Sequence, residues 1–449
     1  MRLYKGKKDI LNGNIVEQIL LITIPFTGTY LLQQLYQFVD SIVLGRFAGV
    51  EALAAIGGSS NMIINIILNI ITGIATGVMI VVAQSYGRGD VNKVALSVKT
   101  GMFIAVVFGG VITLISIVTS KPLLILMRVP VETISPSLIY MYWYFAGIIP
   151  YTIYQIGNYI LRASGDTKIS LLFTIVIAVT KILFDLLLTA VLNLGIWGVA
   201  ISTFLSYLIC GIIVLAILNK STDIYQYDIR DFGYDLQILK QVFKIGVPVA
   251  IQSAVFAITN AVVSIRINEF GTNAVAAFGA YNNVDNFYWS FTNAIGAAIV
   301  TIVGQNYGNK NMPRVKEILR KAILIHFVAS ILIGVFEFTC GKFIFSVFTT
   351  NSDVVAIADR MIKFITFSYP LYILVEMVSG TIKGCGDSMN SMIIAIIGIC
   401  VVRLVYLTIF NFTDVVQVLY CYPLSWGITS IMYLIYYLAN KKYRLSKTN

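Results

Sequence analysis

Lys181 and Asp185 stand four residues apart in the apolar run TKILFDLLLTAVL, residues 180–192. Residues at this spacing lie on one face of a helix, so the ammonium and the carboxylate can touch. Loss of water drives a buried carboxylate toward its protonated form, and a neighbouring ammonium favours its charged form. Such a pair can bind and release a proton. The alternative is a static ion pair that only makes the helix packing specific.

Asp40 is a second carboxylate in an apolar segment, and with Gln33 and Gln37 it forms one helix face at the spacing i, i+4, i+7. Polar side chains in membrane helices commonly hydrogen-bond neighbouring helices, which is the simpler interpretation of any single amide. Several coordinated stripes favour a water-filled cleft, and Glu376 is a candidate titrating group of the second half of the chain. The other cleft candidates are Asn61, Asn65 and Asn69; Gln252 and Thr259; and Asn282, Asn286 (or Asp285) and Trp289.

These polar residues lie in an unusually apolar chain. Of its 449 residues, 58% are hydrophobic and 12% are charged, and the mean hydropathy is +0.85, whereas soluble domains carry about 25% charged residues. Apolar runs of about 18 residues or more predict membrane-spanning helices. We therefore expect an all-α integral membrane protein with twelve spans: 18–45, 56–83, 96–119, 136–160, 169–190, 195–218, 243–267, 275–304, 320–346, 359–382, 390–411 and 417–439.

The basic charge predicts the orientation of these spans. The net charge is +11. If both termini lie on one side and the loops alternate, most Lys and Arg residues fall on that side, which the positive-inside rule makes cytoplasmic. The charge therefore indicates topology, and no nucleic-acid partner is expected.

The two halves of the chain repeat each other. VAQSYGRGDVNKV (82–94) resembles VGQNYGNKNMPRV (303–315), and LRASGDTKIS (161–170) resembles IKGCGDSMNS (382–391) at the same separation. We predict an N-terminal six-helix lobe (1–219), a cytoplasmic linker (220–242) and a C-terminal six-helix lobe (243–449). Six spans return the chain to the same side, so the repeat is parallel, which is a known plan of transporters.

The sequence contains no motif that indicates an enzyme. GCGD (384–387) fits a pattern of intramembrane proteases, but ASGD (163–166) occupies the same place in the first half, so both are interpreted as turns with a helix-initiating Asp. The chain carries no Walker motif and no HExxH, and its five cysteines form no CxxC pair. We expect no enzyme, no metal site, no ATP hydrolysis and no cofactor beyond a coupling ion.

QFVDSIVLG (37–45), the paired AQSYG and GQNYG segments, and RASGDTK (162–168) resemble the MATE (multidrug and toxic compound extrusion) family of the MOP flippase superfamily over residues 10–440. The resemblance implies two lobes in a bacterial inner (plasma) membrane. It also implies a monomer that exchanges cationic or lipophilic organic compounds for H⁺ or Na⁺ by alternating access.

The family's cation-coupling positions fall on Asp40, Lys181, Asp185 and Thr203. Lys181 stands where the family usually has Asn, and an ammonium there would occupy the cation's place or repel it. Phe256 stands where one branch carries an acidic residue in the seventh helix. These departures favour proton coupling over Na⁺.

Two other functions are compatible with the sequence. A flippase for lipid-linked sugars shares the two-lobe plan, but its cleft should hold several cations, and here the spans contain Lys181, Arg266 and Arg403. Amides and aromatic residues suit flat, lipophilic cations instead, through stacking and cation–π contact. A membrane receptor or scaffold without transport is the third possibility, and the polar stripes count against it.

Overall fold

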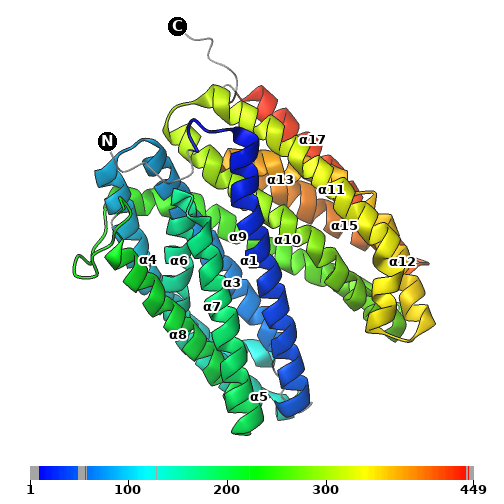
Figure 1. Ribbon diagram of the computed structural model, residues 1–449. Coiled ribbons are helices and arrows are strands. Elements are labelled where there is room, and N and C mark those ends of the chain that lie inside the picture. The colour runs from blue at the N-terminus through cyan, green and yellow to red at the C-terminus, as the bar shows by residue number, and fades with distance from the viewer. Residues whose placement is uncertain are drawn as a thin grey trace. The chain divides into compact units, whose positions relative to one another are not determined.

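The computed structural model describes residues 10–48, 56, 58–127, 129–221, 223–440 and 443, and the regular elements among them are all helical (Figure 1). The chain forms two compact units. One contains Gly28–Ala250, and the other contains Ile251 onward together with the segment that ends at Thr27. The division falls inside α1 and α9, the first long helix of each half.

In the described residues, the first unit is built mainly from seven α-helices and two short extensions. Two short π-helical segments, η1 and η2, continue α1 and α7. The elements are α1 (Ile15–Val43), η1 (Leu44–Ala48), α3 (Ser59–Gly87), α4 (Val91–Leu126), α5 (Val131–Ala146), α6 (Ile148–Ser164), α7 (Thr167–Asp185), η2 (Leu186–Val191) and α8 (Ile196–Lys220).

The second unit has the same order of long helices, with a π-helical segment inside its last-but-one span. Its elements are α9 (Leu236–Asn268), α10 (Thr272–Gly308), α11 (Met312–Phe348), α12 (Ser352–Thr366), α13 (Tyr369–Gly384), α14 (Ser388–Ala395), η3 (Ile396–Val401), α15 (Val402–Ile409), α16 (Val415–Val418) and α17 (Cys421–Ala439).

Ten helices of the described chain are long and apolar enough to cross a membrane, and α12 with α13 makes eleven if this pair, bent by 54°, is one span. The predicted fourth span, 136–160, is not one continuous helix. It is divided between α5, of 16 residues, and α6, of 17 residues, which meet at Gly147. The predicted tenth span, 359–382, is divided in the same way between α12 and α13.

A proline follows each break at the same distance and contributes to it. Pro150 lies four residues after Ala146, the last residue of α5, and Pro370 lies four residues after Thr366, the last residue of α12. A helix would continue through an N–H donated to those carbonyls, and proline has none. The two halves thus interrupt equivalent spans for the same chemical reason.

The predicted turns lie where the repeat placed them. Gly165 and Gly386 both adopt positive φ, 86° and 82°, which favours glycine. Asp166 accepts from the Ile169 N–H and so caps α7. Asp387 likewise stands at the N-cap position of α14, but its carboxylate accepts from the Asn390, Tyr436 and Tyr443 side chains rather than from a backbone N–H of the first turn.

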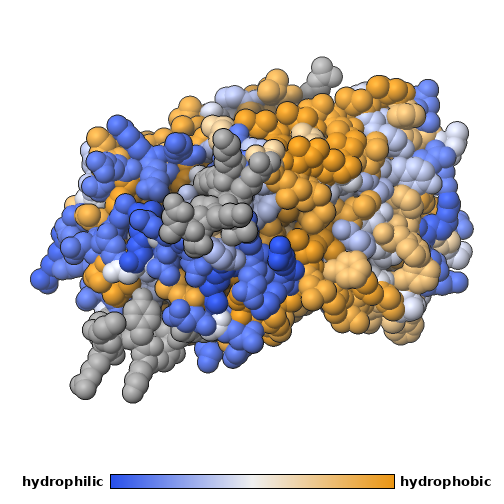
Figure 2. Space-filling model, turned by 90° about the horizontal axis from the view of Figure 1, so that it is seen from above, coloured by the Kyte–Doolittle hydropathy of each residue, from blue (hydrophilic) through white to orange (hydrophobic). Residues whose placement is uncertain are grey.

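Large apolar side chains cover much of the outer surface. Leu114, Val118 and Leu126 of α4 are 67%, 74% and 77% exposed, and Figure 2 shows broad hydrophobic areas of this kind. Such surface is stable against hydrocarbon, and the helices satisfy their own backbone hydrogen bonds there.

Candidate functional site

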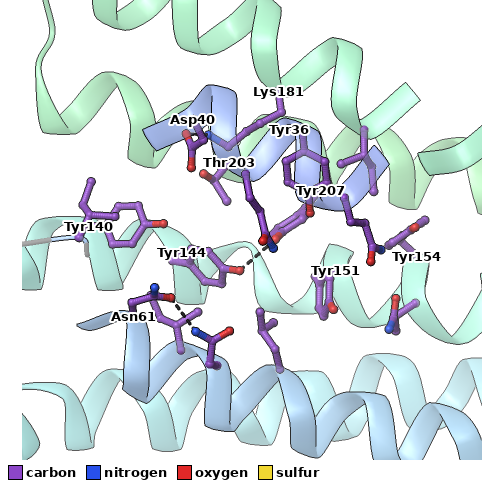
Figure 3. Close-up of a pocket in the computed structure, with 18 of the residues that line it drawn as sticks. Tyr36, Asp40, Asn61, Tyr140, Tyr144, Tyr151, Tyr154, Lys181, Thr203 and Tyr207 are labelled. Carbon is purple, nitrogen blue, oxygen red and sulfur yellow. Dashed lines mark hydrogen bonds and ion pairs between the residues drawn. The ribbon is translucent and has the colours of Figure 1, made fainter. Parts of the chain in front are cut away.

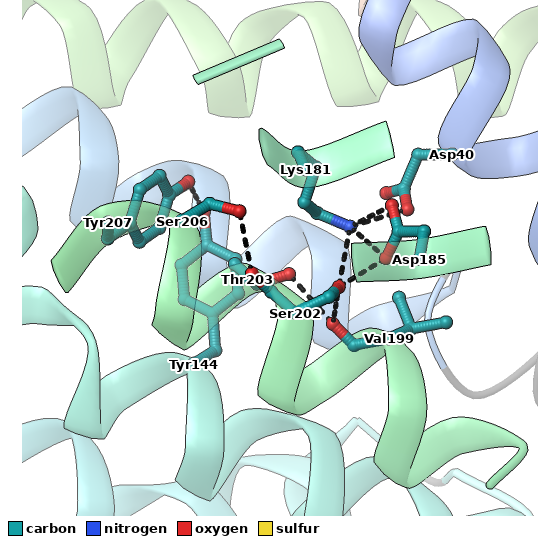
Figure 4. A network of polar contacts seen from close by, with 9 residues as sticks. All are labelled: Asp40, Tyr144, Lys181, Asp185, Val199, Ser202, Thr203, Ser206 and Tyr207. Atoms are coloured by element: carbon teal, nitrogen blue, oxygen red, sulfur yellow. Dashed lines mark hydrogen bonds and ion pairs between the residues drawn. The ribbon is translucent and has the colours of Figure 1, made fainter. Parts of the chain in front are cut away.

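Lys181 of α7 lies between two carboxylates of the first unit (Figure 4). Its Nζ donates to Asp40 Oδ1 at 2.7 Å and lies 2.6 and 2.8 Å from the two oxygens of Asp185. Lys181 is 6% exposed and Asp185 is 1% exposed, whereas the Asp40 side chain is 21% exposed. One positive and two negative charges leave the cluster one proton short of neutrality when both carboxyls are ionised.

The helix ends explain how α1 and α7 bring these residues together. Asp40 lies one turn before η1, and Asp185 is the last residue of α7 before η2. The segments η1 and η2 are in contact. Short π-helical segments inside helices frequently mark functional sites, and here both begin just beyond an acidic residue of the cluster.

Ser202 of α8 completes the cluster, and the sequence analysis missed it. Its hydroxyl donates to Asp185 Oδ1 and lies 3.3 Å from Lys181 Nζ. Thr203, the position implied by the family resemblance, donates to the Val199 carbonyl at 2.9 Å and forms no hydrogen bond with Lys181 or Asp185 among the described residues. No signal in the segment AISTFLSY distinguishes Ser202 from its neighbour, because the choice depends on which side of α8 faces α7.

Replacing Ser202 should therefore cost more than replacing Thr203. We expect Ser202→Ala to lower the free energy of unfolding by about 2 kcal/mol, because a hydrogen bond to a charged group contributes about 1.5–3 kcal/mol. Thr203→Val, which keeps its shape and loses a bond within its own helix, is the matched control. Equilibrium unfolding in mixed micelles measures both, and equal losses would show that Ser202 does not support the cluster.

A cavity of about 370 Å³ opens beside this cluster (Figure 3). Seven of the residues singled out in the sequence line it: Gln33, Gln37, Asp40, Asn61, Asn65, Lys181 and Thr203. Six tyrosines, which the sequence analysis did not single out, line it as well: Tyr36, Tyr140, Tyr144, Tyr151, Tyr154 and Tyr207. The Tyr144 and Tyr207 hydroxyls are 2.9 Å apart, so much of the cavity lining is aromatic with polar edges.

The amides of α3 bond along their own helix. Asn65 Nδ2 donates to Asn61 Oδ1 at 2.7 Å, and Asn69 Nδ2 donates to the Asn65 carbonyl at 2.9 Å. Asn69 does not line the cavity. The stripe therefore presents its first two amides to the cavity, and its third lies beyond it.

A second cavity, of about 450 Å³, lies in the second unit. Asn282, Asn286 and Trp289 line it, together with Asp285, Arg403 and the aromatic side chains Phe256, Phe278, Tyr372 and Tyr422. Arg403 lies 4.4 Å from the Tyr422 ring centroid and donates to Asn260 Oδ1 and Ser425 Oγ, both at 3.0 Å. An aromatic ring, an amide oxygen and a hydroxyl thus stabilise the charge of the Arg403 guanidinium.

Three other residues predicted for the cleft lie outside this cavity. On α9, Phe256, Asn260 and Ser264 face it rather than Gln252 and Thr259. Glu376 does not line it either, and it has a partner in its own span, since Tyr372 donates to Glu376 Oε2 at 3.3 Å. His326 is buried, with its Nε2 lying 3.2 Å from Thr292 Oγ1.

Within the described residues, no group of three or more His, Cys, Asp or Glu side chains could hold a metal ion. All five cysteines are free thiols, and Cys210, Cys385, Cys400 and Cys421 are buried. They lie in helices or at helix ends and fill space between them, as small apolar residues do.

The MatE family model matches residues 25–187 and again residues 248–409. The chain belongs to the MATE family. The two matches correspond to the two halves, so the internal repeat is a repeat of the family's own unit. Because the family is one of transporters, the chain is a multi-span membrane transporter and not an enzyme.

Relatives and solved structures cover nearly the whole chain. The chain is 27% identical to the probable multidrug resistance protein YpnP of Bacillus subtilis, over 90% of each chain. It is 25% identical to the probable multidrug resistance protein YoeA of the same organism, over 93% of this chain and 92% of that protein. An outward-facing multidrug resistance MATE family transporter of the MOP superfamily has the same fold, with a TM-score of 0.88 at 20% identity over 96% and 97% of the two chains.

Proposed function

We propose that this transporter exports cationic or lipophilic organic compounds in exchange for protons by alternating access. The observation that carries the proposal is the cluster of one ammonium and two carboxylates at the cavity of the first unit. Buried charges in membrane proteins are costly, and they mark ion and proton pathways. The names of the relatives, multidrug resistance proteins, support the substrate class.

The arrangement of ligands favours a proton over Na⁺. A hard cation needs several oxygen ligands, and Lys181 Nζ already lies 2.6–2.8 Å from the carboxylate oxygens that could supply them. A sodium ion placed there would also meet the repulsion of the ammonium. A proton needs only one free carboxylate oxygen.

Asp40 is the carboxyl that exchanges the proton in this mechanism. It is partly exposed in the cavity and has one bond to Lys181, whereas Asp185 has two contacts to Lys181 and one from Ser202. Protonation of Asp40 weakens its ion pair with Lys181 and so releases α1 from α7. A change in this ion pair biases the protein between two conformations, as alternating access requires.

The cavity wall suits the proposed substrates. Six tyrosines and several amides line it, with Asp40 at one end. Aromatic faces attract organic cations, more strongly when both partners are shielded from water. A flat cation could stack on the tyrosines and compete with Lys181 for Asp40, so that substrate and proton bind in turn.

The proposed location is a bacterial cell membrane, with both termini in the cytoplasm and the protein acting as a monomer. The distribution of Lys and Arg supports this orientation. Part of that distribution lies outside the described residues: Arg2, Lys5, Lys7, Lys8, Arg128, Lys441, Lys442, Arg444 and Lys447.

Ethidium transport in proteoliposomes tests the proposal, with a pH gradient and a Na⁺ gradient imposed separately. We expect the pH gradient alone to drive transport, and Asp40→Asn and Asp185→Asn to abolish it, because each removes a protonatable oxygen from the cluster. Glu269→Gln is the control, since Glu269 is exposed and pairs only with Arg266 at 3.0 Å among the described ion pairs.

Other outcomes would redirect the proposal. Transport driven by Na⁺ alone would contradict proton coupling through Lys181. No ethidium movement under either gradient would favour a flippase for lipid-linked sugars, which labelled lipid would then test.

A further inference from the structure

The Tyr369 hydroxyl lies between two carboxyl groups deep in the second unit. Tyr369 Oη is 2.7 Å from Asp285 Oδ1 and 2.5 Å from Glu337 Oε2. The three residues come from α13, α10 and α11, and none is more than 6% exposed. Tyr288 stacks on Tyr369 with ring centroids 3.6 Å apart and planes 3° apart, so the hydroxyl is held in place.

The number of hydrogens at this position requires a bound proton. A phenol has one hydrogen and can donate to only one of the two carboxyls. The other contact would set lone pairs of a tyrosine and a carboxylate against each other at hydrogen-bonding distance. Both distances fall in the range of O–H···O bonds. At least one of the two carboxyls therefore carries a proton.

The surroundings assign that proton to Glu337. Asp285 also accepts from Trp289 Nε1 at 2.7 Å and from the Tyr281 hydroxyl at 3.1 Å, and such donors stabilise a charged carboxylate. Glu337 Oε1 is buried and has no hydrogen-bond partner in the described chain. A charged carboxylate with an unpaired buried oxygen costs far more than a neutral acid in the same place.

No neighbouring cation replaces the proton. In the described part of the second unit, neither Asp285 nor Glu337 forms an ion pair, and Lys363 of α12 pairs with Asp359 at 2.8 Å. Arg403 lines the same cavity as Asp285 but bonds to Asn260 and Ser425. Other titratable groups on the helices packed here include Tyr281 and Tyr288 of α10, His326 of α11, Tyr372, Glu376 and Lys383 of α13, and Tyr422 of α17, and Lys342 of α11 is exposed.

We propose that Glu337, Tyr369 and Asp285 form a proton relay, in which Glu337 stores the proton and Asp285 passes it to the cavity of the second unit. We call the protonated Glu337 the proton store. Glu337 Oε2–H gives its proton to Tyr369 Oη while Tyr369 gives its own to Asp285 Oδ1. One O–H bond breaks at Glu337, one forms at Asp285, and the phenol is unchanged. Asp285 lines the cavity, so the proton leaves there to water or is displaced by an organic cation.

The assignment of a bound proton follows from the local geometry alone. Its use in exchange rests on the proposed function. The second unit would thus hold an exchangeable proton in addition to the one at the Lys181 cluster. Transport would then move more than one proton in each cycle.

Infrared spectroscopy of the full chain in lipid nanodiscs tests the store. We expect the C=O stretch of a protonated carboxyl at neutral pH, a decrease of this band in Glu337→Gln that appears in the difference spectrum, and no change in Glu269→Gln. Tyr369→Phe keeps the stacked ring, so it should fold and keep the band. Adding ethidium should shift the band in the wild type but not in Tyr369→Phe.

The outcomes separate the relay from the exchange mechanism. A wild type without a protonated-carboxyl band, or a difference spectrum between the wild type and Glu337→Gln that shows no such band, would overturn the buried proton at Glu337. A ligand-induced shift that persists in Tyr369→Phe would overturn the relay. Failure of ethidium transport in the wild type with the band intact would contradict only the proposed exchange.

Discussion

Lys181→Met is expected to lower the free energy of unfolding by about 3 kcal/mol near neutral pH, because removing one partner of a buried ion pair leaves an uncompensated charge. Here two carboxylates, Asp40 and Asp185, would lose their common partner. Methionine fills a similar volume, so the loss measures charge rather than a cavity. Asp40 is partly exposed, which places the loss toward the lower end of the range for buried pairs.

The pH dependence of this variant has a definite sign. Without Lys181, the folded state gains from protonating the two carboxyls and binds more protons than the unfolded chain. Stability then falls as pH rises and recovers as pH falls. The difference between variant and wild type should shrink in acid, as equilibrium unfolding in mixed micelles over a pH series would measure.

Lys363→Met is the matched control, since Lys363 is 41% exposed and pairs with Asp359 one turn away. Such a pair contributes about 0.5 kcal/mol. Adding Asp185→Asn to Lys181→Met should restore part of the loss. Equal stability of the wild type and Lys181→Met at every pH would mean that the ammonium does not balance the two carboxylates.

Lys181→Asn is expected to make the protein sensitive to Na⁺. The change removes the ammonium and supplies an amide oxygen beside two carboxylates and the Ser202 hydroxyl, a set of hard oxygen ligands. A ligand at ten times its Kd stabilises the folded state by about 1.4 kcal/mol. The melting temperature should therefore rise with NaCl in this variant and stay constant in the wild type.

Choline chloride at the same ionic strength separates binding from screening. Lys181→Met, which lacks the amide oxygen, should respond less than Lys181→Asn. Stabilisation of the wild type by Na⁺ to the same extent would place the ion elsewhere in the chain.

The sequence determined the membrane class, the repeat and the first part of the site. Long apolar runs predict membrane helices because hydrocarbon demands that each segment satisfy its own backbone. The spacing of Lys181 and Asp185 predicts contact because four residues make about one helical turn. The sequence could not predict that the spans containing Pro150 and Pro370 are interrupted, since other prolines, such as Pro25 and Pro248, stand inside continuous helices.

Only the tertiary structure decided which helices meet, and with which faces. Ser202 rather than Thr203 reaches Asp185 because of the rotation of α8 against α7. Glu337 stands alone in an apolar run of α11, and Asp285, the other carboxyl at the Tyr369 hydroxyl, lies 52 positions earlier in the sequence. Helical periodicity assigns residues to a face of their own helix, but the neighbour of that face depends on packing between helices distant in the sequence.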